Sequence, residues 1–209
     1  MDYGDPSMWA PLFPDYLIPV IIDLVLDSWK RLPTPASDDH EVPITRRLVV
    51  MMRRHKNRWK RPFSIHAESD ELNQETGDLL GRIDMRIFHG RREDVYFAFE
   101  CKRLNVQSNG ARSSLAGEYA DEGMARFVSG KYAGGLDSGG MLGYVMDGDL
   151  RSAMAAVRKA VEARRRELCM DSGGTLAVSS VFPKKARVKE TRHRQAGKPF
   201  LIHHVFLVA

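Results

Sequence analysis

A glutamate and a lysine follow directly on a strongly apolar segment, and this combination most constrains how the chain folds. Residues 95–99 (VYFAF) lead into Glu100-Cys101-Lys102. Side chains of a strand alternate between its faces, so Glu100 and Lys102 share one face and Cys101 lies on the other. Unpaired buried charge is strongly disfavoured, so two charged residues ending an apolar strand need a reason. Catalysis with a metal ion is such a reason.

A second carboxylate lies upstream. The segment before the turn-like residues 89–94 alternates, with Asp84 on one face and Ile83 among the apolar residues of the other. An antiparallel hairpin centred on Arg92 sets Asp84 directly opposite Glu100, with their Cβ atoms about 5 Å apart. Like charges so placed repel each other, and a divalent cation removes the repulsion. Mg²⁺ prefers such hard oxygen ligands.

Two alternatives to this site are open. A one-residue bulge in either strand would shift the register and separate the two carboxylates. The hairpin would otherwise be a surface ribbon whose acids are neutralised by Lys102 and Arg86. The apolar character of the second strand favours a buried site, because an exposed ribbon alternates polar and apolar residues.

A third acid stands at the start of a predicted helix. Residues 37–39 (SDD) are typical of a helix start, and the helix is expected from about Glu41 to about Asn57. At 100° per residue Glu41 falls within the apolar stripe of this helix, so its carboxylate can reach a neighbouring sheet. The alternative is a first-turn glutamate that complements the helix dipole.

Asp84, followed by Glu100-x-Lys102 and preceded by a helical Glu41, resembles the PD-(D/E)XK superfamily of restriction-endonuclease-like nucleases. Ile83 stands where the proline of the family name would be. No Gln-x-x-x-Tyr follows the lysine strand, so the chain is less similar to the RecB-like branch. The motif strands and the first helix span about residues 38–104.

The resemblance implies a function and a set of site residues. Asp84 and Glu100 would bind Mg²⁺, for which Mn²⁺ is expected to substitute, together with the backbone carbonyl of Cys101 and the helical Glu41. Lys102 would position or activate the attacking water. The expected activity is Mg²⁺-dependent hydrolysis of phosphodiester bonds, in DNA rather than RNA, because a carboxylate-held cation polarises water and bridges phosphate oxygens. Small bacterial proteins similar to this one often belong to restriction or phage-defence systems.

Composition bounds the remaining possibilities. The chain has 209 residues, 43% of them hydrophobic, which suits one domain with a sizeable core. Two cysteines provide neither a disulfide framework nor a zinc site, and a reducing cytoplasm is expected. We expect no signal peptide and no membrane span, since residues 17–26 are interrupted by Pro19 and Asp23. Serine or cysteine hydrolase chemistry finds no motif.

The net charge of +5 and the pI of about 9.3 favour a polyanionic partner, and two segments carry most of the basic residues. Residues 44–67 contain no acid, and residues 184–198 contain a single one, Glu190. Both are candidate phosphate-contacting surfaces, or else solvated basic faces. Their basic residues are Arg46, Arg47, Arg53, Arg54, Lys56, Arg58, Lys60 and Arg61 in the first segment, and Lys184, Lys185, Arg187, Lys189, Arg192, Arg194 and Lys198 in the second.

The order of the predicted elements gives the fold class. We expect an α/β protein whose central mixed sheet has helices on both faces, with residues 1–37 as an N-terminal helical extension and residues 38–209 as the restriction-endonuclease-like domain. Residues 184–198 are expected to be a basic loop that carries His193. A helix is expected from Glu118 to Lys131, with Arg126 facing either phosphates or, more simply, solvent.

Three functions fit these residues. The first is the DNA nuclease, acting as a homodimer or with a partner protein. The second is a non-catalytic nucleic-acid-binding subunit in which the acids are structural. The third is cleavage of RNA, which no motif excludes.

Overall fold

The structure is a computed structural model that describes residues 13–58, 60–61, 63–73, 75–89, 94–108, 110–171 and 173–209, with Arg58 and Ser108 described by their backbone alone. Trp59 and the centre of the 89–94 turn, including Arg92, lie outside the described residues. No helix in these ranges is both long and apolar enough to cross a membrane.

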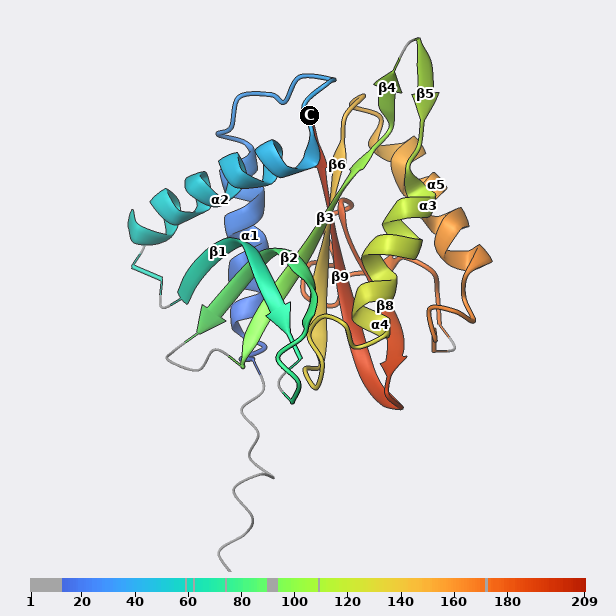
Figure 1. The fold of residues 1–209 in the computed structure, drawn as a ribbon. Helices are drawn as coiled ribbons and strands as arrows, with labels where there is room; N and C mark the ends of the chain where they lie inside the picture. Colours follow the sequence, from blue (N-terminus) through green and yellow to red (C-terminus); the bar gives the residue numbers. More distant parts are fainter. Residues whose placement is uncertain are drawn as a thin grey trace, which may run out of the picture.

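A seven-stranded mixed sheet forms the middle layer, in the order β1-β2-β3-β6-β9-β8-β7 (Figure 1). The central pairs β3–β6 and β6–β9 are parallel, and the outer pairs are antiparallel. The strands are β1 (Phe63–Leu72), β2 (Leu79–His89), β3 (Tyr96–Leu104), β6 (Ser138–Val145), β7 (Ala177–Val178), β8 (Val188–Gln195) and β9 (Lys198–Val208), and a separate ribbon pairs β4 (Val106–Ser108) with β5 (Ala111–Ser113).

Helices cover both faces of the sheet, which confirms the predicted α/β class. The helices are α1 (Leu17–Trp29), α2 (Glu41–Arg58), α3 (Ala116–Glu118), α4 (Ala125–Val128) and α5 (Leu150–Ala163), with the π-helix η2 (Tyr119–Met124) joining α3 to α4. The first two pack on one face, and the other helices pack on the opposite face (Figure 1). The first helix, from the predicted extension, contributes Ile21, Ile22 and Val25 to the same core as α2.

The hairpin register follows the prediction up to the proposed site. The pairs Phe88–Tyr96 to Met85–Phe99 have the predicted alignment, so no bulge shifts this ladder. The ladder stops one position before Asp84 and Glu100, where β2 begins to leave β3. Ile83 accordingly packs in the core of the opposite face from Met85, contrary to the shared face that alternation predicts.

A further prediction from sequence was wrong. The segment 184–198 is not a basic loop, because its residues 188–195 form β8, in which five of the eight side chains are buried. His193 is one of these and is fully buried, so it does not contact phosphate. The strand β1 likewise continues through the acidic residues after Glu68 as far as Leu72. The strands β8 and β1 are hard to recognise in the sequence because their charged side chains alternate with few apolar residues.

A buried polar chain links β8 and β9 to the π-helix. His193 Nδ1 donates to the Leu168 carbonyl oxygen at 2.6 Å, so its neutral ring accepts at Nε2 from the Thr191 hydroxyl at 2.6 Å. Thr191 then accepts from His204 Nε2 at 2.8 Å, and His204 Nδ1 accepts from the Tyr119 hydroxyl at 2.9 Å. Burial lowers the pKa of both histidines, which keeps them neutral. These contacts therefore assign every proton in this series of hydrogen bonds.

The adjacent His203 lies on the other side of β9, as strand alternation predicts. It is buried against Phe97, and neither of its ring nitrogens has a partner among the described residues. Burial lowers its pKa to about 4, so it too is neutral. A pocket of about 300 Å³ adjoins this ring.

Replacing Thr191 with valine is expected to lower the free energy of unfolding by about 2–4 kcal/mol, because the histidines on either side each lose a partner while buried. Chemical denaturation measures this loss. The control Thr191→Ser keeps the hydroxyl and should stay within about 1 kcal/mol of the wild type. Equal losses in the two variants would show that the methyl group, not the polar chain, is what matters.

Candidate active site

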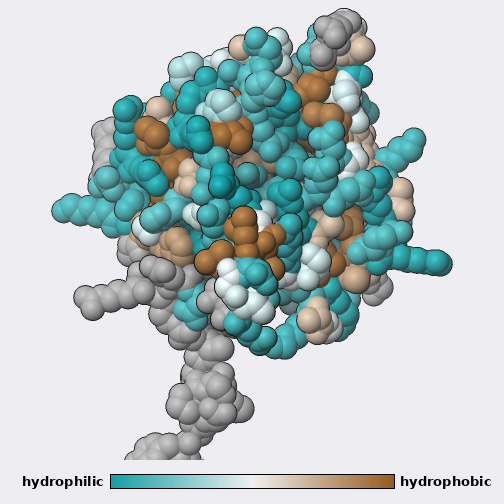
Figure 2. Space-filling model, viewed as in Figure 1, coloured by the Kyte–Doolittle hydropathy of each residue, from teal (hydrophilic) through white to brown (hydrophobic). Residues whose placement is uncertain are grey.

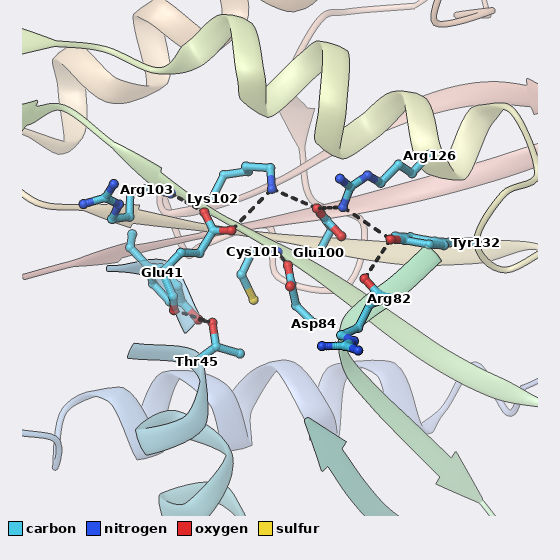
Figure 3. A network of polar contacts seen from close by, with 11 residues as sticks. Glu41, Thr45, Arg82, Asp84, Glu100, Cys101, Lys102, Arg103, Arg126 and Tyr132 are labelled. Atoms are coloured by element: carbon cyan, nitrogen blue, oxygen red, sulfur yellow. Dashed lines mark hydrogen bonds and ion pairs between the residues drawn. The ribbon is translucent and has the colours of Figure 1, made fainter. Parts of the chain in front are cut away.

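The four side chains singled out from the sequence meet around the end of β3 (Figure 3). Glu100 and Lys102 come from β3 itself, Asp84 comes from β2, and Glu41 comes from the first turn of α2. Glu100 is fully buried, Lys102 is 9% exposed, and the other two acids are partly exposed. The site is therefore assembled where the sheet meets the start of a helix.

Lys102 is the centre of the cluster. Its ammonium donates to Glu100 Oε1 at 2.9 Å and to Glu41 Oε1 at 3.3 Å. Burial by itself would lower the pKa of Lys102, but the two carboxylates outweigh burial and raise the pKa above its usual value. Lys102 is therefore a fixed cation that bridges β3 and α2.

Glu41 is held by contacts at both its side chain and its backbone. Its Oε2 accepts the backbone N–H of Arg103 at 3.1 Å, while the Thr45 hydroxyl donates to its carbonyl oxygen at 3.0 Å. The same Thr45 hydroxyl contacts the Tyr144 hydroxyl of β6 at 2.9 Å, which joins the first turn of α2 to the sheet. Glu41 thus reaches the sheet, as its place in the apolar stripe predicted.

The carboxylate of Asp84 takes the place of a backbone hydrogen-bond acceptor where β2 leaves β3. Its Oδ2 accepts the N–H of Cys101 at 2.7 Å, a donor that the next pair of the ladder would otherwise have used. The N–H and C=O of one strand residue point toward the same edge, so the Cys101 carbonyl faces β2 as well. The thiol of Cys101 lies on the other face, within the core. Asp84 and the carbonyl of Cys101 therefore lie at one edge of β3, beside Glu100.

The three carboxyl groups are electrostatically costly in this position. Burial and then the neighbouring Asp84 raise the pKa of Glu100 to about 8. Burial raises the pKa of Asp84 and of Glu41 as well, although hydrogen bonds and Lys102 oppose the shift. Perturbed carboxyl groups clustered around one buried lysine are typical of functional sites, because folding alone gains nothing from their repulsion.

One atom of the cluster lacks a partner. Glu100 Oε1 accepts from Lys102 and from Arg126, whereas Oε2 is buried and has no hydrogen-bond donor among the described residues. A buried carboxylate oxygen without a donor, next to a second carboxylate, fits a cation. Within the described ranges, no three His, Cys, Asp or Glu side chains are grouped to hold a metal ion. The groups that could hold a cation here are therefore the carboxylates of Asp84 and Glu100 and the backbone carbonyl of Cys101.

Arg126 belongs to the cluster, which the sequence did not indicate. Its Nη1 donates to Glu100 Oε1 at 2.6 Å and lies 3.3 Å from the Tyr132 hydroxyl. Arg126 follows directly on the π-helix η2, whose wider turn changes which residues of the helix face the sheet. A regular helical projection therefore leaves Arg126 on the solvent side, and no simple sequence signal announces the π-turn.

Glu68 is a second residue that sequence reasoning missed. The β1–β2 register sets Glu68 opposite Asp84, and its φ of 50° lies in the left-handed region, which is rare for a residue other than glycine. Its carboxylate pairs with Arg46 of α2. Backbone strain of this kind concentrates at functional sites. Glu68 therefore marks the outer limit of the acidic cluster.

The basic residues of α2 divide into two groups. Arg46 pairs with Glu68, Arg47 pairs with Asp39, and Arg53 donates to the Ile65 carbonyl oxygen at 2.7 Å. These three guanidinium groups are partly engaged by the protein. The remaining candidates have no side-chain partner among the described residues, namely the exposed Arg54, the half-buried Lys56, and the exposed Lys60 and Arg61 just after the helix. The side chain of Arg58 lies outside the described residues.

The second basic segment lies at the other end of the sheet from α2, so the two do not form one surface. Lys185 pairs with Asp23, Arg192 pairs with Glu190 at 2.8 Å, and Arg194 pairs with Asp171 at 2.9 Å. Lys184 is exposed and Arg187 is half-buried. The helix α2 supplies Glu41 from its first turn, whereas Arg54 lies toward the other end of the same helix.

A pocket of about 330 Å³ opens beside the cluster, between the start of α2 and the α3–η2 segment. Glu41 and Lys102 line it, together with Glu118 and Glu122. The face of the molecule shown in Figure 2 is largely hydrophilic, with separate small apolar patches rather than one continuous apolar surface. The cluster is therefore reached through a polar opening.

Comparison with protein-family models, curated proteins and solved structures gives no match for this chain.

The raised pKa of Glu100 predicts a pH dependence of stability in the absence of divalent cations. The native carboxyl group of Glu100 holds a proton that the unfolded chain releases. The contribution of Glu100 to the free energy of unfolding is therefore complete below pH 4.5 and declines as the pH rises toward about 8. The slope attributable to Glu100 is at most about 1.4 kcal/mol per pH unit. Urea denaturation in EDTA between pH 5 and pH 9 measures it.

Glu100→Gln should flatten this part of the profile, since an amide does not titrate. The control Glu122→Gln changes an exposed acid of η2 and should leave the slope as in the wild type. A wild-type profile that rises over this range, or one that Glu100→Gln leaves unaltered, would contradict the raised pKa of Glu100.

Proposed function

We propose that this chain is a Mg²⁺-dependent nuclease that hydrolyses phosphodiester bonds of DNA, with a restriction-endonuclease-like core. The observation that carries the proposal is the convergence of Asp84, Glu100, Lys102 and Glu41 at the end of one buried strand, with a carboxylate oxygen left without a donor. Its support is geometric, since the spacing of the residues resembles the PD-(D/E)XK motif and their side chains meet.

Each residue has a defined role in the proposed reaction. Asp84, Glu100 Oε2 and the carbonyl of Cys101 would hold the ion. Bound Mg²⁺ would supply a more acidic water and neutralise charge on the phosphate. Lys102, a fixed ammonium, attracts the anionic phosphate and stabilises negative charge that develops near Glu100. Glu41 fixes the Lys102 side chain from the α2 side, so that the ammonium does not rotate into solvent.

The basic surface of α2 is the proposed contact to the DNA backbone. Among its exposed cations, Arg54 lies toward the far end of the helix that also brings Glu41 to the site, and Lys60 and Arg61 follow directly after this helix. Phosphate contacts of this kind position a nucleic acid without reading its sequence. We further propose a cytoplasmic protein that acts in restriction or phage defence, alone, as a homodimer or with a partner protein.

The decisive experiment is cleavage of plasmid and linear duplex DNA by the purified protein in Mg²⁺ or Mn²⁺, with EDTA as the blank and single-stranded RNA as a second substrate. Asp84→Asn and Glu100→Gln are each expected to slow single-turnover cleavage at least about 100-fold, because each removes a ligand charge. The matched control Glu122→Gln removes an exposed carboxylate at the rim of the pocket and should retain activity within about threefold.

The same assay distinguishes the rival function. Nucleic-acid binding without cleavage in either metal, unchanged by Asp84→Asn, would favour a non-catalytic binding subunit. Preferential loss of the RNA would reassign the substrate but keep the active site.

DNA affinity is expected to fall steeply with salt, because backbone binding releases counterions. The double variant Arg54→Gln/Lys60→Gln should weaken binding about tenfold and reduce the slope of log K against log [salt] by about one to two. Fluorescence anisotropy in EDTA measures both quantities. The control Lys184→Gln/Lys198→Gln removes two exposed cations at the opposite end of the sheet and should change little. Equal effects of the two pairs would argue against α2 as the DNA-binding surface.

A further inference from the structure

We infer that Arg126 binds the phosphate under attack and is a catalytic residue of this site, an inference that rests on the proposed nuclease function. Arg126 reaches Glu100 from the helical layer opposite α2 (Figure 3). Lys102 therefore comes to the cluster from the sheet, and Arg126 comes from the η2–α4 helix. The substrate class is a phosphodiester whose two non-bridging oxygens need donors.

The contact between Arg126 and Glu100 is unlike an ion pair that serves stability alone. Arginine and carboxylate pair most strongly when two parallel N–H groups meet both carboxylate oxygens. Arg126 instead uses a single nitrogen, on Oε1, the oxygen that Lys102 already contacts. Oε2 stays without a donor although the guanidinium is adjacent. A guanidinium held at one end in this way keeps most of its hydrogen-bonding capacity for another anion.

The guanidinium of Arg126 has N–H groups that no described residue uses. Guanidinium carries five N–H donors, and among the described residues its hydrogen bonds involve only Nη1, with Glu100 and Tyr132. Its side chain is 30% exposed, whereas the carboxylate of Glu100 is fully buried. The ring of Tyr132 lies 5.5 Å from the guanidinium carbon, and its hydroxyl donates to the Arg82 carbonyl oxygen at 2.7 Å. Arg126 is thus fixed between the buried acid and the solvent.

Two features of the helix bring Arg126 to this position. The π-turn η2 immediately precedes α4 and changes the phase of the helix by its wider turn. Gly123 leaves room for the sheet, since a Cβ at this residue would lie 2.4 Å from Met141 Cε and 3.7 Å from Glu100 Cγ. The helix therefore approaches Glu100 closely just where Arg126 leaves it.

The role of Arg126 is electrostatic and adds no covalent step. Water attacks phosphorus, a new P–O bond forms, and the bond to the leaving sugar oxygen breaks, giving a phosphate monoester and an alcohol. The proton that the water loses balances the proton that the leaving alkoxide gains. Charge on the non-bridging oxygens rises in the transition state, and preorganised donors there typically contribute about 100- to 1,000-fold in rate.

The test compares Arg126→Ala with Arg164→Ala, a matched control. Arg164 also pairs with an acid of η2, Asp121, and its side chain is 33% exposed, but it lies outside the carboxylate cluster. Single-turnover cleavage of duplex DNA in Mg²⁺ at saturating protein gives the rate constant, and anisotropy in EDTA gives the dissociation constant. Arg126→Ala should lower the rate constant about 100-fold or more with the dissociation constant within about threefold. Arg164→Ala should leave both within about threefold.

Chemical rescue separates catalysis from structure. Added methylguanidinium should raise the rate of Arg126→Ala at least about tenfold and leave the wild type and Arg164→Ala unchanged, because it restores the missing donors. Arg126→Lys keeps the charge without the planar fork and serves if the alanine variant does not fold. It should cleave about tenfold more slowly than the wild type.

The outcomes are distinct. A wild-type protein that cleaves no nucleic acid overturns the proposed function and this inference with it. If the wild type cleaves and Arg126→Ala resembles Arg164→Ala, the nuclease stands and the role of Arg126 is wrong. A loss confined to the dissociation constant, or no rescue by methylguanidinium together with full activity of Arg126→Lys, also overturns it.

Discussion

The ammonium of Lys102 is the interaction on which the rest of this structure depends. It is almost completely buried, and a buried cation is tolerated only when its charge is matched and its donors are used. Glu100 and Glu41 meet this requirement from two different elements, so the first turn of α2 must sit over the end of β3. One electrostatic requirement thereby fixes how the α2 layer lies on the sheet. The same requirement concentrates acids at the site.

Departures from regular structure gather around this point. The β2–β3 ladder ends before Asp84, the backbone of Glu68 turns left-handed on the neighbouring strand, and the helix above becomes a π-helix at Tyr119. Each costs hydrogen bonds or backbone strain that a regular sheet or helix would avoid. The buried chain from His193 to Tyr119 helps to hold the π-helix, since it fixes the first of its residues from below. The irregularities are thus supported by a well-satisfied core.

The sequence predicted the parts of the site that follow strand and helix periods. The alternation of residues 95–102 placed Glu100 and Lys102 on one face, the hairpin alignment brought Asp84 to Glu100, and the apolar stripe of α2 turned Glu41 inward. The periods gave no guide where the helix changes from α to π. No local signal distinguishes a π-turn, so for Arg126 the sequence favoured solvent over its alternative, a contact with phosphate.

Charged strands were the other source of error. The strand β8 pairs with β9 over eight residues, but the arginines of β8 led to the prediction of a loop from the sequence. Basic residues of β8 and α2 also pair with acids of other segments, among them Asp171 and Glu68, because ion pairs between distant segments depend on the tertiary fold. Counting basic residues along a chain therefore overestimates how many remain free for a ligand.

The hydrogen bond from Arg53 to the Ile65 carbonyl oxygen affects how two copies of this protein can associate. The strand β1 is ten residues long and forms one border of the sheet, where an exposed row of backbone groups invites an added strand from a neighbouring molecule. Arg53 occupies the Ile65 carbonyl oxygen, and the left-handed turn at Glu68 interrupts the straight run of the backbone. This border is consequently a poor template for fibril-like growth.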